Sequence, residues 1–254
     1  MEKGMARIPI AVQLYSVRED CQRDFAGTLK AVAKMGYEGV EFAGIYGPSP
    51  TETGNMLDDL GLKVAGAHIS LDALLGDELK RTVELHQTLG NQFLIAPGLP
   101  EERRSSKAAW RETGRLFSEI AEKLKPFGMK PGSHNHAVEV SPIEGEIAWD
   151  VFFSNCTPDV VMQLDTGNAL HGGMDPVRLL ERHPGRAVTV HLKEDSKTND
   201  KALVGEGDVR WKDVFRLCET TGGTQWYIVE QESYPYPPLE CVDRCLKWLR
   251  AQGK

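Results

Sequence analysis

Short apolar segments alternate with amphipathic segments along the whole chain, and this alternation restricts the fold more than any other feature of the sequence. Eight apolar segments read as strands, at residues 8–15, 39–42, 63–68, 92–96, 129–136, 160–165, 187–193 and 226–232. Nearly continuous apolar runs of this length are typical of strands buried on both faces of a parallel sheet.

The segments between these strands repeat apolar residues at helical spacing. They predict helices at residues 25–36, 52–60, 71–89, 106–127, 146–153, 176–182, 211–221 and 239–252. Eight strand–helix units of about 30 residues each predict a (β/α)8 TIM barrel, an α/β fold that forms a single domain over residues 1–254. An open, doubly wound sheet is the alternative, but it usually has fewer strands, and no glycine-rich phosphate fingerprint follows the first strand.

The net charge bears on the expected partners, and the cysteine content bears on the expected location. The formal net charge of −7 argues against non-specific binding to nucleic acid or to an anionic membrane surface. No segment approaches the roughly 20 consecutive apolar residues of a membrane span, and the N-terminus lacks the apolar run of a signal peptide. The five cysteines are an odd number in a chain too large to need disulfides, which favours a reducing, cytoplasmic location. A small molecule is the expected partner, and a homo-oligomer stays open.

Polar side chains gather at the carboxyl ends of the predicted strands. The stretch GSHNHAVEV, residues 132–140, places His134 and His136 two positions apart, on one face of a strand. Other strand ends carry Glu41, His68, Asp165, His191, Lys193, Glu230 and Glu232. The carboxyl ends of the strands of such a barrel form one mouth, where active sites lie. The sequence therefore predicts one site built from residues that are far apart in the chain.

Four of these residues predict a metal site. His134, Asp165, His191 and Glu230 are expected to surround one divalent ion. Two imidazoles and two carboxylates suit Mn²⁺, Co²⁺, Zn²⁺ or Fe²⁺, and Mg²⁺ also stays open. Each residue alone is more often a structural group than a ligand. Four together would be hard to bury without a cation, because an unpaired buried carboxylate costs several kcal/mol.

These motifs resemble the sugar isomerase and epimerase superfamily of xylose-isomerase-like barrels. The resemblance covers essentially the whole chain and rests on AVQLYSVRED, GVEFAG, HNHAVEV, MQLDTGNA, VHLKED with the later VGEGDVRW, and YIVEQE. In that superfamily the metal is held by a Glu on strand five, an Asp on strand six, a His on strand seven and a Glu on strand eight. Asp165, His191 and Glu230 match these positions, whereas strand five offers His134, with His136 or Glu139 as alternatives.

The resemblance implies a metal-dependent isomerase or epimerase that acts on a keto sugar or sugar phosphate through a metal-stabilised enediolate. Ketose epimerases of the superfamily use the strand-five and strand-eight glutamates on opposite faces of the substrate, and only Glu230 remains of that pair here. His136 or His68 could replace the lost base, since imidazole titrates near neutrality. Glu230, Lys193 and His136 are the predicted catalytic residues.

Two alternatives stay open, and only the first uses the same metal and the same enolisation. A metal-dependent lyase, dehydratase or 3-keto-glycoside hydrolase is the first, and a sugar-binding barrel without catalysis is the second. The superfamily also contains endonucleases that act on abasic DNA. The chain fits them poorly, because no histidine pair comes after strand seven and the net charge is negative.

The predicted substrate contacts lie around the mouth. Tyr15 ends strand one, Glu41 belongs to strand two and His68 ends strand three. Glu206 lies in a Gly-Glu-Gly segment, residues 205–207, that resembles a loop of the family, and it is expected to close on the site.

Overall fold

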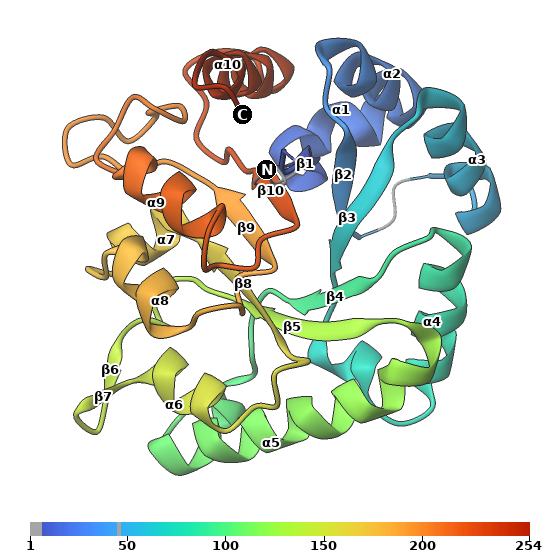
Figure 1. The fold of residues 1–254 in the computed structure, drawn as a ribbon. Coiled ribbons are helices and arrows are strands. Elements are labelled where there is room, and N and C mark those ends of the chain that lie inside the picture. Colours follow the sequence, from blue (N-terminus) through green and yellow to red (C-terminus); the bar gives the residue numbers. More distant parts are fainter. Residues whose placement is uncertain (1–6, 45–46) are drawn as a thin grey trace, which may run out of the picture.

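Eight parallel strands close into a barrel that is surrounded by helices, as seen in the computed structural model of the chain, which describes residues 7–44 and 47–254 (Figure 1). The barrel strands are β1 (Ile10–Gln13), β2 (Gly39–Ala43), β3 (Lys63–His68), β4 (Phe93–Ala96), β5 (Lys130–His134), β8 (Val161–Asp165), β9 (Thr189–Leu192) and β10 (Trp226–Val229). They neighbour one another in chain order, and β1 pairs with β10 to close the barrel. The predicted (β/α)8 barrel is confirmed.

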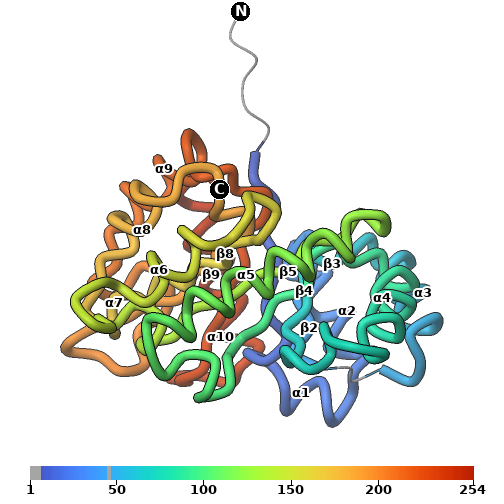
Figure 2. The backbone as a smooth tube through the Cα atoms, turned by 90° about the horizontal axis from the view of Figure 1, so that it is seen from below, coloured from blue at the N-terminus to red at the C-terminus, as the bar shows by residue number. Residues whose placement is uncertain are grey.

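Helices cover the outside of the barrel. The α-helices are α1 (Arg18–Arg23), α2 (Phe25–Met35), α3 (Pro50–Leu60), α4 (Glu78–Thr88), α5 (Lys107–Leu124), α6 (Ala148–Ser154), α7 (Thr166–His171), α8 (Pro176–Arg182), α9 (Trp211–Cys218) and α10 (Pro238–Ala251). Short 3-10 helices lie at Leu14–Val17, Leu71–Leu74, Glu101–Arg103 and Lys125–Phe127. Seen from below, α2–α4 lie on one side of the barrel and α6–α8 on the other (Figure 2). No helix of the described residues is long and apolar enough to cross a membrane.

Local sequence sets the ends of the helices. In α3, the Ser49 hydroxyl accepts a hydrogen bond from the Glu52 backbone N–H at 3.2 Å, and Pro50 occupies the first turn, where no backbone donor is needed. Gly61 ends the helix with a φ of 68°, a left-handed conformation that favours glycine. Similar signals at other helices explain why the alternation of elements could be predicted.

Several predicted boundaries are wrong. The strand predicted at 129–136 ends at His134, so His136 lies beyond the strand rather than on its face. The helix predicted at 71–89 is a 3-10 turn and a separate α4, because Gly76 between them takes a φ of 53°. The short helix α7 and the antiparallel pair β6 (Pro142–Ile143) and β7 (Glu146–Ile147) were not predicted.

The inside of the barrel changes from apolar to polar along the strands. Residues two apart on a strand share a face, so each strand sends every second side chain inward. The lower layer is apolar and contains Ala11, Ala65, Phe93, Ile95, Val161, Trp226 and Ile228. The layer above it is polar and fully buried, with Gln13, Glu41, Gln163, Thr189 and His191. Because buried polar groups are costly unless they are used, this end of the barrel is the candidate site.

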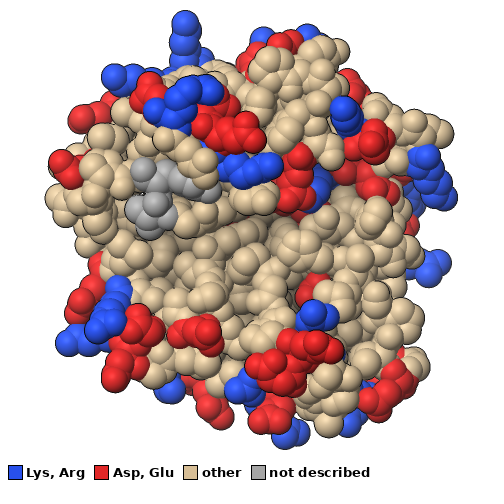
Figure 3. Space-filling model, turned by 180° about the vertical axis from the view of Figure 1, so that it is seen from behind, with Lys and Arg blue, Asp and Glu red and all other residues tan. Residues whose placement is uncertain are grey.

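The face behind the view of Figure 1 is hollowed toward its centre. Figure 3 shows that its central part is mostly uncharged, with Lys, Arg, Asp and Glu side chains around it. Concave surfaces of this kind are where small-molecule ligands commonly bind.

Candidate metal centre

Four neighbouring strands bring His134, Asp165, His191 and Glu230 together. His134 and Asp165 are the last residues of β5 and β8, His191 lies within β9, and Glu230 directly follows β10. Parallel pairing sets Asp165 beside His191. One potential ligand atom of each residue lies within 4.8 Å of those of the other three, and all four side chains are buried. The predicted convergence of these strand ends is therefore present.

The spacing of the four residues fits a cation between them. His191 Nδ1 lies 3.1 Å from Glu230 Oε2 and 3.8 Å from Asp165 Oδ2. Two ligand atoms on one ion with bonds of about 2.1 Å lie about 3.0–3.4 Å apart in octahedral or tetrahedral geometry. The first of these two distances lies within this range, and the second lies slightly above it.

One oxygen of Asp165 has no hydrogen-bond partner among the described residues. Its Oδ1 accepts from the backbone N–H of Asn168 at 2.6 Å, whereas the buried Oδ2 accepts from no group in the described part of the chain. Burial raises the pKa of Asp165 to about 7. A buried carboxylate oxygen without a donor is costly, and a divalent cation would satisfy it. Together with the donor set, this orphaned oxygen shows that the site fits a metal.

The charges of the cluster are strongly coupled to one another. Burial alone would lower the pKa of His191, but the carboxylates of Glu41 and Glu230 raise it to about 10. Burial alone would raise the pKa of Glu230, yet His191 and Lys193 hold it well below its usual range. Burial lowers the pKa of His134 far below the ordinary value of an imidazole. His134 is thus neutral at pH 7, as a metal ligand must be.

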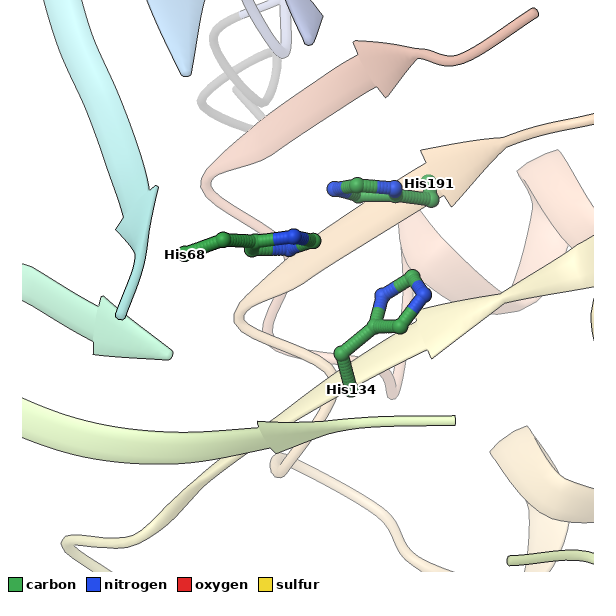
Figure 4. A group of neighbouring side chains, drawn as sticks. All are labelled: His68, His134 and His191. Atoms are coloured by element: carbon green, nitrogen blue, oxygen red, sulfur yellow. The ribbon is translucent and has the colours of Figure 1, made fainter. Parts of the chain in front are cut away.

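Three histidines meet at this point, and Figure 4 shows their rings facing one another from β3, β5 and β9. The ring centroids of His68 and His191 lie 5.2 Å apart with an interplanar angle of 8°, and His134 lies 4.9 Å and 4.7 Å from them. A cation among the three rings is an alternative site. It is disfavoured because hydrogen bonds already occupy the facing nitrogens, at 2.5 Å from His191 Nε2 to Glu41 Oε2 and 2.6 Å from His68 Nε2 to Gln163 Oε1. These distances leave no room for an ion.

Two of the predicted catalytic residues lie beside the cluster. Lys193 Nζ is 3.8 Å from Glu230 Oε2 and also forms an ion pair with Glu232. His136 is exposed at the mouth, and its ring centroid lies 5.0 Å from that of His134. Both residues therefore lie next to the four buried side chains, and their catalytic roles stay predictions.

The predicted substrate contacts divide into two groups. Glu41 and His68 lie in the polar layer, where Glu41 is fully buried and bonded to Gln13 and His191. Tyr15 is 40% exposed, with the Arg18 guanidinium 4.3 Å from its ring centroid. Their contacts with substrate stay predictions.

Glu206 lies apart from the cluster. Its side chain is exposed and accepts a hydrogen bond from the backbone N–H of Leu203 at 3.0 Å. The described hydrogen bonds and ion pairs do not join it to the four candidate ligands. Glu139, the alternative strand-five ligand, is also outside the cluster, because its carboxylate accepts from the backbone N–H of His136 at 2.8 Å.

Two polar residues of the candidate site were not predicted from the sequence. Gln163 precedes Asp165 by two positions, and its amide oxygen accepts from His68 and from His134 Nδ1 at 3.1 Å. Asn168 hydrogen-bonds the backbone oxygen of Asn135 at 3.1 Å and so supports the end of β5. The spacing of Gln163 and Asp165 on one face of a buried strand was the available signal.

The His134→Ala variant is expected to lose metal. A missing direct ligand should weaken metal binding by more than about 10-fold, since even outer-shell changes cost 10–100-fold. Metal per chain after dialysis, measured by elemental mass spectrometry, checks this, with His136→Ala as the matched control. If the metal content of His134→Ala were unchanged, a neighbouring residue would be the strand-five ligand instead.

Comparison with known proteins gives the chain's relatives. A family model described as xylose isomerase-like TIM barrel matches residues 29–252. Among curated proteins, the inosose dehydratase of Erwinia tasmaniensis is 26% identical, over 90% of each chain. The inosose dehydratase of Geobacillus kaustophilus is 29% identical, over 89% of each chain. The rhizopine catabolism protein MocC of Rhizobium meliloti is 24% identical, over 82% of this chain and 74% of its own.

Solved structures share the fold. A sugar phosphate isomerase/epimerase from Parabacteroides distasonis superposes with a TM-score of 0.82 at 24% identity, over 98% of this chain and 96% of its own. The IOLI protein, solved with a bound zinc atom, has a TM-score of 0.76 at 15% identity, over 96% and 97% of the two chains. At these identities the likeness concerns the barrel itself.

Proposed function

The chain belongs to the xylose isomerase-like TIM barrel family, and from this premise we propose that it is a metal-dependent enzyme that enolises a keto sugar or a cyclic keto polyol. The observation that carries the proposal is the buried cluster of two imidazoles and two carboxylates at the barrel mouth. A divalent cation held by His134, Asp165, His191 and Glu230 would supply Lewis acidity to the substrate's carbonyl oxygen and the adjacent hydroxyl.

Glu230 is the proposed proton acceptor. Its carboxylate stays ionised despite burial because His191 and Lys193 lower its pKa, so it can take the hydrogen on the carbon next to the carbonyl. Lys193 lies 3.8 Å from Glu230 Oε2 and can balance the negative charge that develops on the substrate. Glu230 is buried and Lys193 is partly buried, so water screens this charge interaction less than it would at the surface.

His136 is the proposed proton donor. It is exposed at the mouth beside His134, so it can take a proton from water and deliver it to a leaving hydroxyl. The reaction then removes a proton from one carbon, breaks the C–O bond at the next carbon and releases water.

We place the dehydratase outcome ahead of isomerisation. Epimerisation between two faces needs two proton carriers, one on each side of the substrate, and His134 stands where the second carboxylate would be. An elimination needs one base and one acid, which Glu230 and His136 can supply. The curated relatives described as inosose dehydratases support this order.

Isomerisation or epimerisation is the second candidate. It is favoured by the exposed imidazole of His136, which could return a proton to the substrate from outside the buried cluster. Both outcomes share the removal of the hydrogen next to the carbonyl. They differ only in the fate of the resulting enediolate, which either loses a hydroxyl group or regains a proton.

Solvent deuterium exchange tests the shared step. The metal-loaded protein is incubated in D₂O with a panel of keto sugars and cyclic keto polyols, and products are analysed by mass spectrometry and NMR. We expect deuterium next to the carbonyl and a product that is lighter by one water. A product that keeps its mass would make the protein an isomerase or epimerase.

The corresponding alcohols, which cannot enolise, serve as the substrate control. Protein from which a chelator has removed the metal serves as the metal control. A protein that binds metal and sugar without any exchange across the panel would be a binding protein, and the proposal would then be wrong.

A further inference from the structure

A fully buried carboxylate lies beneath the candidate metal centre. Glu41 on β2 has no exposed surface, and its two oxygens have separate partners. Oε2 accepts from Gln13 Nε2 at 2.8 Å and from His191 Nε2 at 2.5 Å, and Oε1 accepts from Gln163 Nε2 at 2.6 Å. Gly66 leaves space for it, because a Cβ there would lie 2.5 Å from Glu41 Oε1.

The contact with Glu41 determines which nitrogen of His191 keeps its proton when the other nitrogen loses its proton to bind a metal. An ionised carboxylate only accepts hydrogen bonds, so His191 Nε2 must be the donor. The other nitrogen, Nδ1, faces Glu230 Oε2 at 3.1 Å and Asp165 Oδ2 at 3.8 Å. A neutral His191 has a proton on only one nitrogen, so it would present the lone pair of Nδ1 to these candidate ligands.

The Gln163 amide fixes the proton position of His134 in the same way. Its amide nitrogen must face Glu41 Oε1, because that oxygen cannot donate. The amide oxygen therefore faces the histidines and accepts from His134 Nδ1 at 3.1 Å. His134 then carries its proton on Nδ1, which leaves Nε2 free. The Asn168 amide nitrogen, 3.5 Å from His134 Nε2, is a donor directed at this unprotonated nitrogen.

From this chain of hydrogen bonds we infer that Glu41 is a positioning residue, which sets the proton positions of His191 directly and of His134 through the Gln163 amide, so that both present a free nitrogen to a divalent cation. The inference rests on the metal centre of the proposed function but not on the substrate. Outer-shell acceptors of this kind orient metal-binding imidazoles and raise their basicity.

The Glu41→Gln variant tests the inference. The new amide nitrogen must face either His191 or Gln163, and each of these donates at that point in the wild type. One of these two hydrogen bonds must therefore reverse its direction. If it is the bond to His191, the proton moves to the other ring nitrogen. If it is the bond to Gln163, the amide turns over and the proton on His134 moves. We expect Co²⁺ affinity to fall about 10–100-fold, measured by visible absorption titration. Glu139→Gln, which changes another buried carboxylate outside the cluster, should keep wild-type affinity.

A second variant tests the hydrogen-bond path from Glu41 through the Gln163 amide to His134. Gln163→Met keeps the size of the side chain but cannot accept from His134 or donate to Glu41. In the double variant, the loss of Co²⁺ affinity should be smaller than the sum of the losses in the two single variants. Both substitutions break the same hydrogen-bond path from Glu41 to His134, and this path can be broken only once. Fully additive effects would remove Gln163 from the inference.

A spectrum of the wild-type protein tests the inference even if a variant fails to fold. Long-range ¹H–¹⁵N NMR correlations of the metal-free protein should show neutral His134 with its proton on Nδ1. A proton on Nε2, or an unchanged Co²⁺ affinity in Glu41→Gln, would overturn the inference. Absence of Co²⁺ binding by the wild type would instead count against the proposed function.

Discussion

Replacing Glu230 with Gln is expected to abolish exchange of the substrate's hydrogen with solvent while the barrel stays folded. The amide keeps the size of the side chain but cannot accept the proton, so the rate should fall by about 10²–10⁴-fold. The fold should survive because Glu230 lies just beyond β10, at the barrel mouth, rather than within the strand ladder. Exchange in D₂O, followed by NMR, measures the rate, and circular dichroism checks the fold.

Two controls separate proton transfer from other losses in this variant. Glu232→Gln changes a neighbouring carboxylate that pairs with Lys193, and it should retain most of the exchange. Metal content of Glu230→Gln must be measured as well, because Glu230 is also a candidate ligand. Full exchange in Glu230→Gln would exclude this residue as the base.

The Asp165→Asn variant is expected to lose metal binding altogether. The amide oxygen would stay at the position that accepts from the Asn168 backbone N–H. The amide nitrogen, which is a donor, would then replace the oxygen that has no partner among the described residues, at the position of the cation. In the wild type, a metal at 100 times its dissociation constant should stabilise the fold by about 2.7 kcal/mol. For a chain of this size that corresponds to a rise in melting temperature of about 5–10 °C. The variant should show no such rise.

Thermal melts with and without added metal measure this difference. Asp195→Asn is the matched control, because this carboxylate lies in the loop after β9 and pairs with His171 rather than with the cluster. A metal-dependent rise in the melting temperature of Asp165→Asn equal to that of the wild type would show that Asp165 is not a ligand.

Much of the candidate site could be predicted from the sequence because parallel strands of a closed barrel end on one side. His134, Asp165, His191 and Glu230 stood out as polar residues at the ends of apolar runs, and their convergence results from the fold alone. Their order in the chain is also their order around the barrel, so the sequence already placed them on adjacent strands.

The end of strand five was predicted only in part from the sequence. The alternation of His134 and His136 predicted one shared face, but the backbone leaves the strand after His134. Asn135 accepts from the backbone N–H of Asp165 at 2.8 Å, which turns the chain toward β8. His136 therefore lies exposed at the mouth while His134 is buried. A side-chain hydrogen bond between distant segments decides this difference, and no local pattern records it.

The sequence by itself determined the barrel, the end of it that carries the site and the residue types that meet there, because hydrophobic periodicity and chain order are enough to set strand topology. Only the tertiary structure decided which atoms face one another. The orphaned oxygen of Asp165 and the roles of Glu41 and Gln163 depend on the register between strands and on the direction of each hydrogen bond. Those directions arise from contacts between residues as far apart as Glu41 and His191, which become neighbours only when the barrel closes.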